Sequence, residues 1–293
     1  MASPLYSANT IDFELVKRFL KDNAGAGFMS VNLHGGEATI HPQFIETLEL
    51  INELGYPEIH LQTNGIKLAR PEFASSLVGL RVTLFIVSLH GSTADTHDSQ
   101  TRSLGGFSQT IAGIQNVKRF GARVRTNTVV TRTNVEELGS ITRLACDLGV
   151  DHLNYSNLHP VGSAVFAVNQ LAPPFELIRQ HLYPAIDYAV SCRRKVTLEG
   201  FPLCTVKAKV EFHLERERRE IKMLMRGVEI DNYDEFMNDT CRVYGLPCSN
   251  CSHRRPCGGV YPEYVQIRGW SEFTPFASVE KNADCAVELE RTK

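Results

Sequence analysis

The stretch 28-FMSVNLHGGEATI-40 joins a short extended run to two glycines and a carboxylate. Residues 28–33 predict a buried strand, because a short apolar run bounded by turn residues packs well in a sheet. An amphipathic helix is predicted before it at 10–20, with Thr10 as its N-terminal cap. A second helix is predicted after it at 42–54, opened by Pro42. A strand held between two helices indicates an α/β fold.

The same alternation of strand and helix continues through the first half of the chain. Strands are predicted at residues 28–33, 59–62, 82–87, 124–130 and 152–158. Strands that alternate with helices form parallel sheets with right-handed crossovers. The predicted fold is therefore a partial parallel β/α barrel. Glycine and polar residues follow the strands, at the edge where β/α barrels carry their active sites.

The rhythm changes after the fifth strand, which divides the chain into three predicted regions. Residues 1–165 form the partial barrel, and the chain starts on a helix, so a strand that would precede it is missing. Residues 166–240 form a mixed extended and helical connection, with its charge-rich part, 207–240, expected to be helical. Residues 241–293 form a small module rich in Cys, Gly and Pro.

Composition excludes several classes of protein. With 43% hydrophobic and 22% charged residues, the chain has an ordinary globular composition. Its net charge of -2 and the lack of a long basic run argue against nucleic acid binding through a broad patch. No apolar stretch is long enough to span a bilayer, and the N-terminus lacks the features of a signal peptide. A cytoplasmic protein is expected.

The eight cysteines are unevenly distributed, and none precedes Cys146. Cys248-x2-Cys251-x5-Cys257 is a compact group, and Cys204 lies upstream after a Gly-Phe-Pro segment. Clustered thiols in a reducing compartment more often bind metal than form disulfides. We expect these four cysteines to hold one metal site, with Cys241 as an alternate ligand. Four thiolates suit either tetrahedral zinc or an iron-sulfur cluster.

Several motifs resemble those of the radical S-adenosylmethionine (radical SAM) superfamily. His34-Gly35-Gly36-Glu37-Ala38-Thr39 resembles its Gly-Gly-Glu-Pro-Thr motif, with Ala38 in place of proline. The other matches follow at later strand ends, in the family's order: Thr63-Asn64-Gly65, Ser88-Leu89-His90-Gly91, Asn134 and Pro160-Val161-Gly162. The resemblance covers residues 28–162 and implies S-adenosylmethionine as a cofactor.

The resemblance also implies roles for individual residues. Gly35, Gly36 and Glu37 would hold the methionyl amino group, and Ser88 would lie near the ribose or the carboxylate. Thr63 and Asn64 would belong to the same cofactor-binding edge. Two interpretations of His90 stay open: a direct role at the site, or a hydrogen-bonded residue at a strand end.

One departure from the family bears directly on chemistry. Radical SAM enzymes carry CxxxCxxC after their first strand, where three thiolates hold a four-iron four-sulfur (4Fe-4S) cluster that reduces the sulfonium. No cysteine occurs in residues 1–145. Either the chain is an N-terminally shortened version, or it is a relative that no longer cleaves the cofactor. In both cases we expect the printed chain not to cleave S-adenosylmethionine by itself.

The tail resembles the auxiliary-cluster (twitch or SPASM-like) region of radical SAM proteins, where an upstream cysteine and a CxxC-x5-C run bind a second 4Fe-4S cluster. Tyr261 stands where tryptophan is common. The leading hypothesis is radical SAM-type chemistry on an unknown peptide or small molecule, with an electron-donor protein. A second hypothesis is a non-catalytic scaffold with structural zinc that binds a peptide or protein partner. A third is a metal hydrolase that uses the strand-end residues His34, Glu37, His60, His90 and His159.

Overall fold

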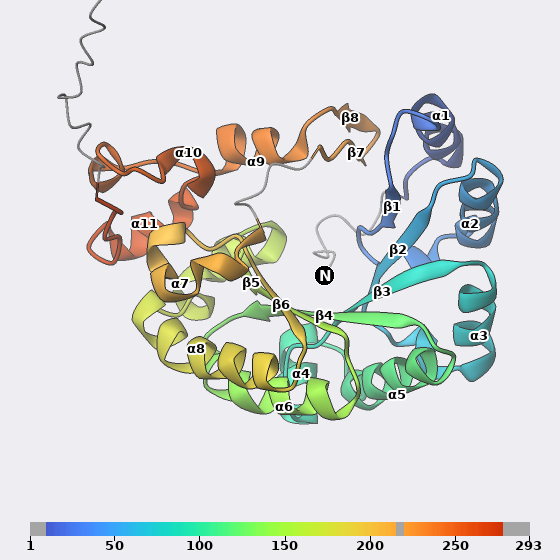
Figure 1. Cartoon of the computed structure of the whole chain (residues 1–293), viewed down its shortest axis with the longest axis horizontal. Coiled ribbons are helices and arrows are strands. Elements are labelled where there is room, and N and C mark those ends of the chain that lie inside the picture. Colours follow the sequence, from blue (N-terminus) through green and yellow to red (C-terminus); the bar gives the residue numbers. More distant parts are fainter. Residues whose placement is uncertain (1–9, 215–219, 278–293) are drawn as a thin grey trace, which may run out of the picture.

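The structure is a computed structural model that describes residues 10–214 and 220–277. Its centre is a six-stranded, all-parallel sheet whose strands lie in sequence order (Figure 1). The strands are β1 (Ser30–Leu33), β2 (Glu58–Thr63), β3 (Val82–Ser88), β4 (Arg123–Val130), β5 (His152–Asn157) and β6 (Lys195–Glu199). The predicted partial β/α barrel is therefore confirmed.

Helices cover the outer, convex face of this curved sheet (Figure 1). They are α2 (Phe44–Glu53), α3 (Pro71–Gly79), α5 (Gly106–Arg119), α6 (Leu138–Asp147) and α8 (Phe175–Ser191). Side chains on this face, such as Phe85 of β3 and Tyr155 of β5, are almost fully buried against the helices. No described helix is long and apolar enough to cross a membrane.

Two local predictions in the first half need adjustment. Asp12 rather than Thr10 caps α1 (Phe13–Asn23), since its carboxylate accepts a hydrogen bond from the Glu14 backbone at 2.9 Å. The sheet also has one strand more than predicted, because β6 pairs with β5 in parallel, with Lys195 opposite His152. The extended segment after α8 thus belongs to the barrel sheet.

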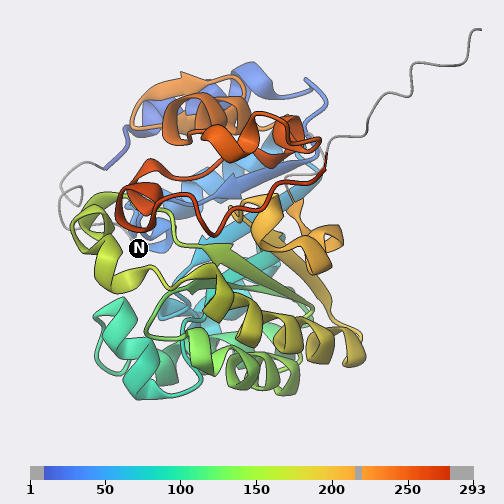
Figure 2. The same cartoon turned by 90° about the vertical axis from the view of Figure 1, so that its left-hand side faces the viewer.

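The charge-rich segment 207–240 is only partly helical: residues 207–212 form a 3-10 helix and residues 233–240 belong to an α-helix, but a β-hairpin lies between them. Strands β7 (Met223–Met225) and β8 (Val228–Ile230) pair antiparallel, and both residues of the connecting turn, Arg226 and Gly227, have positive φ. Two-residue turns of this kind match the twist of the flanking strands. A Cβ placed on Gly227 would lie 3.5 Å from the Leu15 side chain. The hairpin therefore lies beside α1, as both views show (Figures 1 and 2).

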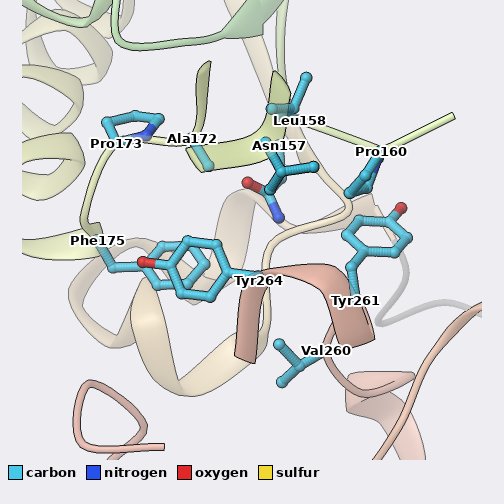
Figure 3. Close-up of a pocket in the computed structure, with 10 residues that line it drawn as sticks. Asn157, Leu158, Pro160, Ala172, Pro173, Phe175, Val260, Tyr261 and Tyr264 are labelled. Carbon is cyan, nitrogen blue, oxygen red and sulfur yellow. The ribbon is translucent and has the colours of Figure 1, made fainter. Parts of the chain in front are cut away.

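The C-terminal module consists of short helices: α9 (Tyr233–Cys241), α10 (Arg254–Cys257) and α11 (Pro262–Arg268). It packs on the barrel beyond the end of β5, where the Phe175 and Tyr264 rings lie 4.7 Å apart (Figure 3). A carboxylate oxygen of Glu272 accepts a hydrogen bond from the Phe175 backbone at 2.8 Å. The apolar seam between barrel and module is also lined by Pro160 and Tyr261. The module is thereby anchored to the barrel edge that carries the candidate site.

Candidate functional site

The predicted strand-end residues gather at one edge of the sheet. Gly35 and Gly36 follow β1, Thr63 ends β2, and Ser88 ends β3. Pro160 follows β5 in the same way. Because all these strands are parallel, their carboxyl ends face the same side. The structure thus brings the predicted residues to a single edge, as expected from the strand order.

Glu37 holds the ends of β1 and β2 together. One of its carboxylate oxygens accepts hydrogen bonds from the Thr39 hydroxyl at 2.8 Å and backbone N–H at 3.3 Å, and from the Thr63 hydroxyl at 2.8 Å. The other oxygen accepts from the Asn64 backbone N–H at 2.7 Å. The neighbouring Gly35 has φ of 138°, a conformation that favours glycine. Glu37 therefore fixes the shape of the loop at residues 34–37, called the glycine loop below, through its contacts with Thr39, Thr63 and Asn64.

His90 is a buried structural residue. It is 5% exposed, its Nδ1 accepts a hydrogen bond from the Val129 backbone at 3.3 Å, and burial lowers its pKa to about 3. The ring is therefore neutral at pH 7. Asn134 donates to the carbonyls of His90 and Val129, at 2.9 Å each. Of the two interpretations of His90, the geometry supports the hydrogen-bonded strand-end residue.

A polar network on the inner face of β4, β5 and β6 was missed by the sequence analysis. Asn154 donates to Asn127 at 2.7 Å and to Glu199 at 3.0 Å, and Ser156 donates to Asn127 at 2.8 Å. Arg125 forms an ion pair with Glu199 at 3.4 Å. The sequence did contain a signal for this network. Parallel strands that are buried on both faces are usually continuous apolar runs, and β4 and β5 are not. Alternating polar residues in β4 and β5 indicate a polar interior.

All four predicted cysteine ligands line one cavity. The cavity is partly open to solvent, and its walls include Cys204, Cys248, Cys251 and Cys257. The Leu203 backbone N–H donates to the Cys257 sulfur at 3.4 Å, which joins the segment after β6 to the tail. Cys204 thus meets a run that lies more than forty residues later in sequence.

Two glycines let the backbone turn tightly beside Cys257. Gly258 and Gly259 follow Cys257 with φ of 71° and 100°. A Cβ on Gly259 would lie 2.9 Å from the Val243 carbonyl, so the turn requires glycine. Burial, and then the charges of Cys257, Cys248 and Cys251, raise the pKa of Cys204 to about 12. Four thiolates in this cavity repel one another unless a cationic group lies between them.

Other residues with metal-binding side chains lie elsewhere. Cys241 is not among the cavity-lining residues. Cys146 is buried on α6, and Cys192 caps the end of α8. His60 hydrogen-bonds Glu58 at 2.7 Å, and His159 stacks on Tyr261 with ring centres 4.6 Å apart.

Among the described residues, no three His, Cys, Asp or Glu side chains are grouped as ligands for a single metal ion. The hydrolase hypothesis needed such a group at the strand ends. The geometry of the described residues therefore gives it no support.

Comparison with known proteins identifies the barrel. The profile of the Radical SAM superfamily matches residues 4–145. The chain carries a radical SAM domain. That match ends before the cysteine-rich module begins. The interpretation of the module therefore depends on the geometry of its cysteines.

Proteins named probable GTP 3',8-cyclase are similar to about half of this chain. One from Saccharolobus islandicus is 32% identical over 167 residues, which are 56% of this chain and 52% of that protein. One from Saccharolobus solfataricus is 34% identical over 146 residues, 49% of this chain and 46% of that protein. The chain therefore spans about half the length of the curated relatives it matches.

Two solved structures share the fold over more of the chain. Native anSMEcpe with bound AdoMet and Kp18Cys peptide aligns with a TM-score of 0.61, 14% identity, and coverage of 92% of this chain and 86% of that one. Streptococcus suis SuiB bound to precursor peptide SuiA aligns with a TM-score of 0.54, 17% identity, and coverage of 78% and 48%. At these identities the likeness concerns the fold alone.

Proposed function

We propose that this chain supplies the barrel edge and the auxiliary-cluster module of a radical SAM-type enzyme that acts on a peptide or small molecule in the cytoplasm. The observation that carries the proposal is the shared cavity of Cys204, Cys248, Cys251 and Cys257 in a chain with a radical SAM domain. The division into residues 1–165, 166–240 and 241–293 remains a prediction within it.

We favour an iron-sulfur cluster over zinc as the occupant of the cysteine cavity. A tetrahedral zinc site with Zn–S bonds of about 2.3 Å holds its sulfurs about 3.8 Å from one another. All four cysteines line one cavity, in a chain with a radical SAM domain. Thiolates that bind different irons of a cubane stand farther apart. The four cysteines are therefore proposed ligands of a 4Fe-4S cluster, and zinc is the alternative.

The glycine loop and its neighbours are the proposed cofactor-binding edge. Gly35 and Gly36 present backbone polar groups there, and Glu37 holds that backbone through the Thr63 hydroxyl and the Asn64 N–H. Ser88 is half-buried at the end of the next strand. We assign these six residues to S-adenosylmethionine binding, with Glu37 acting chiefly by positioning the loop.

The cluster that cleaves S-adenosylmethionine does not fit the residues of this edge. That cluster supplies an electron through an iron held by only three thiolates. Residues 1–145 contain no cysteine, so the CxxxCxxC run that would hold it is not among them. We therefore assign no step of cofactor cleavage to the printed chain. Binding of S-adenosylmethionine by the edge is a separate property, which we propose the chain retains without that cluster.

The names of the relatives and solved structures support two substrate classes. The probable GTP 3',8-cyclases point to a small molecule, and the peptide complexes of SuiB and anSMEcpe point to peptides. Asn127 and Glu199 are half-buried members of the polar network and offer hydrogen-bonding groups to either kind of ligand, while the buried Asn154 holds them in place. We propose a polar substrate that is held against this inner face.

Metal and sulfide analysis after anaerobic purification and reconstitution tests the proposal. We expect iron with acid-labile sulfide in the native chain and its loss in Ala variants at the four cavity cysteines. Cys192→Ala is the matched control, because Cys192 lies outside the cavity and should leave iron unchanged. If Cys204→Ala leaves the cluster unchanged, the four-ligand assignment is wrong and Cys241 becomes the next ligand to test.

The same preparation tests the limit on cofactor cleavage. Reduced, reconstituted protein is incubated with S-adenosylmethionine, and 5′-deoxyadenosine is measured by chromatography. We expect none above background. Turnover by the printed chain alone would show that an electron reaches the cofactor without the CxxxCxxC loop. Zinc without sulfide, together with no binding of S-adenosylmethionine, would favour the scaffold hypothesis.

A further inference from the structure

We propose that Cys146 and Cys192 form a reversible disulfide when the protein meets a low-molecular-weight disulfide such as oxidised glutathione. Neither thiol lines the cysteine cavity, so this modification site goes beyond the proposed function and does not depend on it. Cys146 lies shortly before β5, and Cys192 lies shortly before β6. Both are therefore at the amino edge of the parallel sheet, opposite the edge proposed to bind S-adenosylmethionine.

Two packed helices bring these cysteines together. Helices α6 and α8 lie side by side on the outer face of the sheet (Figure 1). Cys146 is in the last turn of α6, and Cys192 is the C-terminal cap of α8. The side chain of Arg194 donates a hydrogen bond to the Cys146 backbone carbonyl at 3.3 Å. The turn that follows α8 is therefore held against the end of α6.

The two thiols are themselves in contact. Both cysteines are free, and a hydrogen bond joins the Cys146 thiol to the Cys192 thiol. A disulfide requires Cβ atoms about 3.8 Å apart, so it forms only between residues whose backbones already lie close. The contact between the thiols shows that the two helices hold these residues side by side.

The two thiols differ in accessibility, which sets the order of the reaction. Cys146 is only 8% exposed, and burial, followed by the hydrogen bond with Cys192, raises the pKa of Cys146 to about 11. Cys192 is half-buried, and its sulfur is hydrogen-bonded to the Tyr188 hydroxyl. A hydroxyl that donates to sulfur favours the thiolate, which is the nucleophile. Cys192 is therefore the thiol that attacks first.

The reaction is a thiol–disulfide exchange in two steps. The Cys192 thiolate attacks one sulfur of oxidised glutathione, forms a mixed disulfide and releases one glutathione. Cys146 then attacks the Cys192 sulfur of that mixed disulfide and releases the second glutathione. The two cysteines lose two electrons and two protons, and oxidised glutathione takes up both as two glutathione thiols. The second step is intramolecular, so the neighbouring thiol competes effectively with glutathione in solution.

The bond would close a long loop around β5. The two cysteines are 46 positions apart in sequence, and the loop between them contains β5, Pro160 and α8. Cross-linking such distant positions restricts the unfolded chain and so stabilises the fold. For a chain of this length, the loop-closure effect corresponds to a rise of about 5–10 °C in the thermal midpoint.

Peptide mapping of the full chain tests the proposal. Trypsin cuts after Arg143, Arg179 and Arg193, so the two cysteines fall in separate peptides, 144–179 and 180–193, with one cysteine each. The protein is treated anaerobically with oxidised glutathione and blocked with N-ethylmaleimide, and the monomer from a non-reducing gel is digested. We expect the two peptides to be joined, and to separate after dithiothreitol. The thermal midpoint of the treated protein should rise by about 5–10 °C and return after reduction.

Two kinds of variant control the measurement. Cys192→Ser should give no joined peptide and no rise in the thermal midpoint under the same treatment. Tyr188→Phe should slow formation of the mixed disulfide about threefold, as expected for the loss of one hydrogen bond. Tyr183→Phe is the matched control on the same helix, because its hydroxyl lies at the Ala208 backbone, and it should react at the native rate.

Several results would overturn the proposal. Cys192 that carries glutathione while Cys146 is alkylated would show that the two thiols do not reach each other. A bond between two copies of peptide 180–193 would indicate exchange between chains. Alkylation of both cysteines, with an unchanged thermal midpoint, would show that the pair serves only in packing. The cavity cysteines lie in other peptides, so absence of the proposed cluster is recognised separately by iron and sulfide analysis.

Discussion

Replacing Glu37 by glutamine should destabilise the protein, because no orientation of an amide satisfies the donors around that carboxylate. The Asn64 N–H lies 2.7 Å from one oxygen, and the Thr39 N–H lies 3.3 Å from the other. Hydroxyl groups can rotate to accept from an amide, but backbone N–H groups cannot. In either orientation, one backbone donor faces the amide NH2 group of Glu37→Gln.

The expected cost follows from the lost contact. A hydrogen bond to a charged group contributes about 1.5–3 kcal/mol, and an unsatisfied buried donor costs a similar amount. Glu37 is half-buried, so we expect a loss of about 2 kcal/mol in the free energy of unfolding. The weaker 3.3 Å contact is the one that should be given up.

Urea unfolding of the ligand-free protein at pH 7, followed by circular dichroism, measures this loss. The control is Glu49→Gln, an exposed residue of α2, which should change stability by less than about 0.5 kcal/mol. A double-mutant cycle with Thr63→Val should give a coupling energy of about 1 kcal/mol. If Glu37→Gln costs no more than the control, Glu37 does not hold the strand ends together.

Two further predictions concern the packing around the site. The His90 pKa is about 3 in the fold and 6.5 in the unfolded chain, so its stabilising contribution is present above pH 6.5 and is lost as the pH falls toward 3. Linkage gives a loss of about 1.3 kcal/mol between pH 7.5 and 5.5, which should be absent from His90→Asn; an unchanged pH dependence of urea unfolding in that variant would contradict it. Gly113→Ala should cost about 2 kcal/mol in spite of the helix propensity of alanine, because its Cβ would lie 2.5 Å from the Gly65 carbonyl. Gly79→Ala meets no atom within 4 Å and should leave the thermal midpoint unchanged or raise it.

The periodicity of the sequence determined the α/β class, five of the six barrel strands and the common edge for the strand-end residues. These features depend on local geometry: apolar residues recur with the period of the backbone, and parallel strands end on one side. The cysteine run, Cys248 to Cys257, could also be found directly, because its ligands are close in sequence.

The tertiary structure decided which distant residues meet. From the sequence, the segment Lys195–Glu199 can be predicted only as extended, and its pairing with β5 shows that it belongs to the barrel. Thr63, the partner of Glu37 on β2, lies 26 residues away, and the Leu203 backbone contacts the Cys257 sulfur across 54 residues. Local propensity carries no information about such contacts, since their free energy depends on packing between segments that the chain brings together only when it folds.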